Sequence, residues 1–181
     1  MELMHAHLAG VFAELDKVRS DLRAAVDAVP QARRSERPGE GRWSVAEILE
    51  HLSLVEQRFT AIIALRIAEA REAGLGPEEG TRTPFPTKLR QMLGDRADRR
   101  IAPEPVQPRA GLNEAASWAE LERARATLRA TVSAADGMAL SRVVHNHPVF
   151  GMLNVYQLME FIAGHEARHS KQIAGIAEQL V

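Results

Sequence analysis

The most informative part of this sequence is the run Gly164-His165-Glu166-Ala167-Arg168-His169-Ser170-Lys171-Gln172-Ile173 near the C-terminus. Within it, His165 and His169 belong to a series of residues spaced alternately three and four apart, the spacing of one face of an α-helix. Because a neutral imidazole on a buried face needs hydrogen-bond partners, a metal ion shared by both rings is the simplest explanation. The other members of the series are apolar: Val155, Leu158, Ile162, Ile173, Ile176 and Leu180.

The composition favours one helical domain over residues 1–181. Hydrophobic residues make up 45 % of the chain, which is enough to bury a full core. Helix-forming residues dominate, aromatic residues are only 4 %, and alternating runs of Val, Ile, Thr and Tyr are absent. We therefore expect an all-α protein.

Charge and hydropathy exclude several classes of protein. The chain has 23 Lys and Arg against 24 Asp and Glu, so it lacks the basic surplus of a nucleic-acid-binding protein. No window approaches the roughly 20 apolar residues that cross a bilayer, and Met1-Glu2-Leu3-Met4-His5 lacks the basic start and apolar run of a signal peptide. We therefore expect a cytoplasmic protein without membrane contact. The chain has no cysteine. A metal must therefore be held by His, Asp or Glu, and any reacting thiol would come from a small molecule.

Four long helices account for most of the sequence. The first carries apolar residues at helical spacing until Pro30 ends it. Two Ser-x-x-Glu capping boxes, Ser44–Glu47 and Ser117–Glu120, open the second and third helices. Asn154 is a suitable N-cap for the fourth. The expected helices extend over residues 2 to about 29, 44 to about 73, 117 to about 134, and 154 to 179.

A long crossover joins the second and third of these helices. Residues 74–111 are rich in proline and too numerous for a tight helix hairpin, although a short helix is expected at Thr87–Leu93. Four long helices with one long crossover predict a four-helix bundle, in which metal sites form from side chains on facing helices.

His51 is the third candidate metal ligand. It lies in the inward row of the second helix, whose other members are apolar, and three imidazoles would leave a position open for water or substrate, as in catalytic zinc sites. His165, Glu166 and His169 have the spacing of the His-Glu-x-x-His motif, but we do not expect the peptidase arrangement in which the glutamate is the base. The inward row reads Ile48, His51, Val55, Phe59 and Ile62.

Residues near the three histidines have two interpretations each. Glu47 can orient the free ring N–H of His51 or act as a base, but the capping box alone explains it and is favoured. Gln172 can hydrogen-bond a metal ligand or a bound water, or it is simply the polar edge of the last helix. His147 fits a surface histidine better than a substrate-facing one. Glu166 and Arg168 are expected to face solvent.

Three motifs together resemble the DinB-like superfamily. They are Trp43-Ser44-x-x-Glu47-x-x-x-His51-Leu52, His147-Pro148-x-Phe150-Gly151, and His165-Glu166-x-x-His169-x-x-Gln172-Ile173. The resemblance implies a four-helix bundle with an up-down-down-up course, often a homodimer. It also implies a divalent metal such as zinc or nickel, carried over here onto His51, His165 and His169.

What the resemblance implies about activity is broader. The superfamily includes thiol-dependent transferases and isomerases, metal-dependent hydrolases, and members without known activity, and it implies no contact with DNA. We expect a metal-dependent enzyme that uses a low-molecular-weight thiol to modify electrophilic small molecules. The alternatives are a metal-dependent hydrolase and a non-catalytic binding or stress-response module that the metal stabilises.

Overall fold

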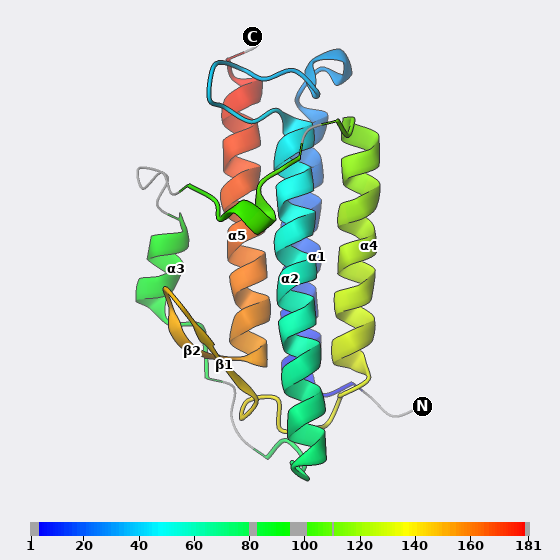
Figure 1. Cartoon of the computed structure of the whole chain (residues 1–181), viewed down its shortest axis with the longest axis vertical. Coiled ribbons are helices and arrows are strands. Elements are labelled where there is room, and N and C mark those ends of the chain that lie inside the picture. Colours follow the sequence, from blue (N-terminus) through cyan, green and yellow to red (C-terminus); the bar gives the residue numbers. More distant parts are fainter. Residues whose placement is uncertain (1–3, 80–82, 95–100, 110, 180–181) are drawn as a thin grey trace.

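Four long helices lie side by side in the computed structural model, which describes residues 4–79, 83–94, 101–109 and 111–179 (Figure 1). They follow the up-down-down-up course, because the second and third of them run in the same direction. The predicted all-α four-helix bundle is therefore confirmed. The long helices are α1 (Ala6–Asp27), α2 (Val45–Glu72), α4 (Glu114–Ser133) and α5 (Val155–Ala177).

The helices pack most closely as two pairs. Helix α1 lies along α5, and α2 lies along α4, with the members of each pair running in the same direction. Two helices that run the same way cannot be joined by a tight turn, so the chain needs the long crossover between α2 and α4. Within the described part of the chain, no helix has the length and apolarity needed to cross a membrane.

Local capping explains where α2 and α5 begin. The Ser44 hydroxyl accepts a hydrogen bond from the Glu47 amide at 3.2 Å, and the Glu47 carboxylate accepts one from the Ser44 amide at 2.8 Å. Asn154 caps α5 in the same way, with Gln157 as its partner. Both predicted caps are confirmed.

The predicted start of α4 is wrong. Asn113 is the N-cap and accepts a hydrogen bond from the Ala116 amide at 2.9 Å, so the helix begins one turn before the expected box. Ser117 is buried inside the helix, and Glu120 pairs with Arg123 instead. Asn113 is the N-cap in place of Ser117 because asparagine is among the best N-cap residues and the residues after it favour a helix.

The inward row of α2 is confirmed through Phe59 and then shifts by one residue. Ile63 is fully buried, whereas Ile62 is only half-buried. A helix has 3.6 residues per turn, so an inward row drifts and the step after Phe59 is four residues rather than three. In the last helix, Leu180 lies outside the described residues.

The crossover lies against α2 and α5. It contains α3 (Thr87–Gly94), close to the expected short helix, and the 3-10 turn η2 (Glu104–Val106). The Leu93 side chain packs on Gly164 of α5, where an added Cβ would lie 3.2 Å from it. A second 3-10 turn, η1 (Gln31–Arg33), lies in the connection between α1 and α2.

A short β-hairpin precedes α5, although the sequence predicts an all-α protein without strands. Strands β1 (Val144–His147) and β2 (Gly151–Asn154) pair antiparallel, with His145 opposite Leu153. Gly151 has φ of +71°, a conformation that favours glycine. The strands are too short to show clear alternation in the sequence, and their pairing holds Asn154 at the start of α5.

Candidate metal centre

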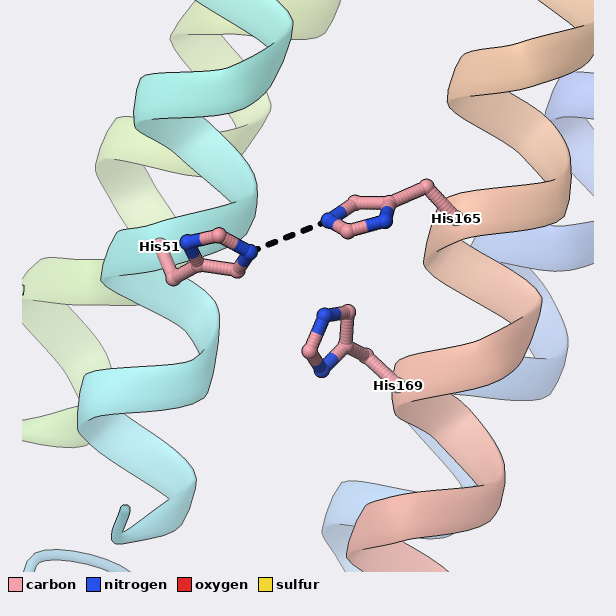
Figure 2. Close-up of side chains that lie close together, drawn as sticks. All are labelled: His51, His165 and His169. Carbon is pink, nitrogen blue, oxygen red and sulfur yellow. Dashed lines mark hydrogen bonds between the residues drawn. The ribbon is translucent and has the colours of Figure 1, made fainter. Parts of the chain in front are cut away.

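Three histidines from two helices converge between α2 and α5 (Figure 2). His51 projects from α2, and His165 and His169 project from successive turns of α5. One nitrogen from each ring lies within 4.8 Å of the other two, and the Nε2 atoms of His51 and His165 are 3.0 Å apart. The structure thus brings together the three residues that the sequence predicts as ligands.

The outer nitrogens of two rings have fixed partners. The Nδ1 atom of His51 lies 2.6 Å from the carbonyl oxygen of Val106, and Nδ1 of His169 lies 2.9 Å from Oε1 of Gln172. Both partners accept hydrogen bonds, so these Nδ1 atoms carry the protons and the Nε2 lone pairs are free.

Burial keeps the three imidazoles neutral. His51 and His169 are 4 % and 6 % exposed, and His165 is half-buried. Loss of hydration lowers the pKa of His51, and it lowers the pKa of His169 to about 3. Burial, with the neighbouring His169 and His51, holds the pKa of His165 well below its usual range. The rings are therefore in the form that binds a metal at neutral pH.

Glu47 lies at the helix start rather than against the His51 ring nitrogen. Its carboxylate accepts hydrogen bonds from the Ser44 amide and the Arg37 guanidinium. The Val106 carbonyl occupies the position that a carboxylate partner of His51 would take. The structure therefore agrees with the favoured capping interpretation. Sequence reasoning missed Val106 because a backbone carbonyl in a crossover has no side-chain signature.

Aromatic rings surround the histidines. The Trp43 ring lies 4.9 Å from the His51 ring, and Phe161 stacks on His165 with centroids 5.8 Å apart. His147 also lies beside Phe161, with ring centroids 5.5 Å apart. Its Nδ1 accepts hydrogen bonds from the Val149 and Phe150 amides in the hairpin turn. A substrate-facing role for His147 stays a prediction.

Two other expectations for α5 are wrong. Glu166 does not face solvent, because it is 1 % exposed and bonded to Arg19 and Arg125. Arg168 is half-buried and donates a hydrogen bond to the Leu93 carbonyl at 3.2 Å. The apolar stripe alone could not reveal that α5 is also covered on these faces, by α1, α4 and the crossover.

The donor set fits a divalent ion. Three neutral imidazoles with converging nitrogens suit zinc and nickel, and a set of three leaves coordination positions for water or another ligand. The partners of the outer nitrogens are those usually found behind metal-bound histidines, a backbone carbonyl and a polar side chain.

Fold and site together define a four-helix bundle with a three-histidine group that can hold a metal ion. The chain belongs to the DinB superfamily, whose family model matches residues 14–173. It is 28 % identical over 147 residues to YuaE, an uncharacterized protein of Bacillus subtilis (strain 168), a match that covers 81 % of this chain and 84 % of YuaE.

A solved structure has the same fold. The crystal structure of TT2238, a four-helix bundle protein, aligns with a TM-score of 0.55 and 21 % sequence identity. The alignment covers 93 % of this chain and 98 % of that one. This likeness supports the fold, and the match to the family model over residues 14–173 confirms the predicted superfamily.

Proposed function

We propose that His51, His165 and His169 bind one divalent ion, zinc or nickel, and that the protein is a metal-dependent enzyme. The observation that carries this proposal is the convergence of three neutral imidazoles from two helices, with nitrogens within 4.8 Å of one another. Neutral, converging donors of this kind would favour binding of an ion at neutral pH.

The proposed reaction is transfer of a low-molecular-weight thiol to an electrophilic small molecule. A divalent ion with an open position supplies Lewis acidity, which lowers the pKa of a coordinated water or thiol. Val106 and Gln172 would hold the rings of His51 and His169 in the binding tautomer. Trp43 and Phe161 would keep bulk water from the ring faces. Because the chain has no cysteine, the thiol would be a co-substrate.

Burial of the site favours a second candidate function. His51 and His169 are almost fully buried, as in a site where the ion only holds helices together. In that case the protein is a metal-stabilised binding or stress-response module, and the ion contributes to folding by linking α2 to α5. A metal-dependent hydrolase is a third candidate and differs from the transferase in needing no thiol.

Metal content tests the site first. We expect protein purified without a histidine tag to carry about one divalent ion per chain by mass spectrometry. The His165→Ala variant should lose the ion, whereas His145→Ala, which changes a histidine outside the group, should keep it. If wild-type protein stays metal-free after incubation with zinc and with nickel, the proposal is wrong.

Turnover assays then separate the three candidates. A transferase should consume bacillithiol, mycothiol or glutathione in the presence of an electrophile, and His165→Ala should not. Hydrolysis without added thiol would identify the hydrolase. Metal-loaded protein that is inactive in both assays but melts at a higher temperature than metal-free protein would favour the stabilised module. A homodimeric state and a cytoplasmic location stay predictions.

A further inference from the structure

A buried cluster of four charged side chains takes one residue from each long helix. Arg19 comes from α1, Glu56 from α2, Arg125 from α4 and Glu166 from α5. Glu56 and Glu166 are each 1 % exposed, and Arg125 is 5 % exposed. We call these residues the ion cluster.

The ion cluster is densely hydrogen-bonded. Arg125 donates to Glu56 at 2.5 Å and to Glu166 at 2.7 Å, and Arg19 donates to the same two carboxylates at 3.2 Å and 2.7 Å. The third nitrogen of each guanidinium is also bonded, because Nη1 of Arg125 donates to the Leu15 carbonyl and Nη1 of Arg19 donates to Glu122. Two positive and two negative charges are therefore matched in the interior.

Such a cluster contributes more to the arrangement of helices than to stability. Buried ion pairs are often no more stabilising than apolar residues of similar size, because desolvation offsets their attraction. Their geometry is specific, however, since a paired arginine and carboxylate tolerate little displacement. Here the cluster joins the pair α1 and α5 to the pair α2 and α4.

The candidate metal ligands also come from both pairs. His51 belongs to α2, and His165 and His169 belong to α5. Glu166 directly follows His165, and Glu56 lies just over one turn beyond His51. Any slip of one pair along the other that separated the histidines would also stretch the bonds of the ion cluster.

We propose that Arg125 and Glu56 are positioning residues for the three-histidine site. By fixing the register of the two helix pairs, the ion cluster holds His51 opposite His165 and His169 before an ion binds. This inference rests on the proposed metal site and gives the ion cluster a role in binding rather than in bundle stability.

The test removes one charge of each sign. In the double variant Arg125→Met with Glu56→Leu, Arg19 and Glu166 still pair, so we expect a folded protein with unfolding free energy equal to or above that of the wild type. Zinc affinity, measured by competition with a chelator, should fall about tenfold or more. The visible absorption of bound cobalt(II), which reports ligand geometry, should also change. The single variant Arg125→Lys, which keeps the charge, should bind zinc more tightly than the double variant and less tightly than the wild type.

Leu128→Ala is the matched control. Leu128 is a fully buried residue of α4, the helix that carries Arg125, and it lies outside the ion cluster. Its truncation should lower the free energy of unfolding and leave zinc affinity unchanged. If the double variant does not fold, Glu56→Gln carries the same comparison, because it removes a charge at nearly constant size.

Two failures are distinguishable. Wild-type protein that binds no zinc, nickel or cobalt overturns the metal site itself. Wild-type protein that binds zinc, together with a folded double variant of unchanged affinity and cobalt spectrum, overturns only the positioning role. Equal losses of affinity in the double variant and in Leu128→Ala also overturn it, since any change in the bundle core would then weaken zinc binding.

Discussion

At the scale of single residues, the site depends on hydrogen bonds that fix ring orientation. Gln172 is the side chain that holds His169, through Oε1 at 2.9 Å from Nδ1. We expect Gln172→Ala to weaken zinc binding about tenfold, because the ring loses the partner that fixes its tautomer. The measurement is zinc affinity by chelator competition. Lys171→Ala, an exposed neighbour on α5, is the control and should bind like wild type. If wild type, Gln172→Ala and Lys171→Ala bind zinc with equal affinity, Gln172 is only a polar residue at the edge of the helix.

The same scale shows what the sequence could predict about the site. His51, His165 and His169 were predictable because each interrupts an apolar row at helical spacing. Val106 and Trp43 were not, because their contacts with His51 depend on how the crossover and the start of α2 pack. Glu166 was misassigned to solvent because its arginine partners lie on α1 and α4, far away in the sequence.

At the scale of elements, the crossover is part of the site. The Val106 carbonyl in η2 accepts the hydrogen bond from His51, so an ion that fixes the His51 ring also holds η2 against α2. We expect zinc to slow hydrogen exchange of the Val106 and Gln107 amides, which close the 3-10 turn. Exchange measured by mass spectrometry on peptides covering η2 should show this slowing in wild type and in His145→Ala, but not in His51→Ala. Zinc-independent exchange in wild type would show that the crossover and the site are not coupled.

Elements were predictable where their signals are local. The Ser44–Glu47 box and the Asn154 cap each act within a few residues, so the starts of α2 and α5 were predicted correctly. The start of α4 was missed because two N-cap candidates, Asn113 and Ser117, compete within one turn. The hairpin was missed because strand pairing joins residues across a turn and leaves little periodicity in such short strands.

At the scale of the whole molecule, the ion cluster and the three-histidine group both join the two helix pairs. When no metal is bound, the histidine group lowers the free energy of unfolding at acid pH, because its rings stay buried and neutral in the folded state. Their folded-state pKa values lie below the unfolded value near 6.5. Above that pH the rings are neutral in both states, so they do not make the free energy of unfolding depend on pH. As pH falls below it, the unfolded chain binds protons that the folded chain does not, so the free energy of unfolding decreases.

The pKa of about 3 for His169 sets the size of this effect. Between pH 7 and pH 5, His169 alone should lower the free energy of unfolding of metal-free protein by about 2 kcal/mol. Urea unfolding with a chelator at both pH values measures the loss, and His169→Ala should show a loss smaller by about that amount. Ile173→Ala removes core packing on the same helix without removing a titrating group, so it should keep the full wild-type pH dependence. Identical pH dependence in His169→Ala and wild type would mean that the His169 ring titrates normally in the folded bundle, and that burial does not keep it ready for a metal.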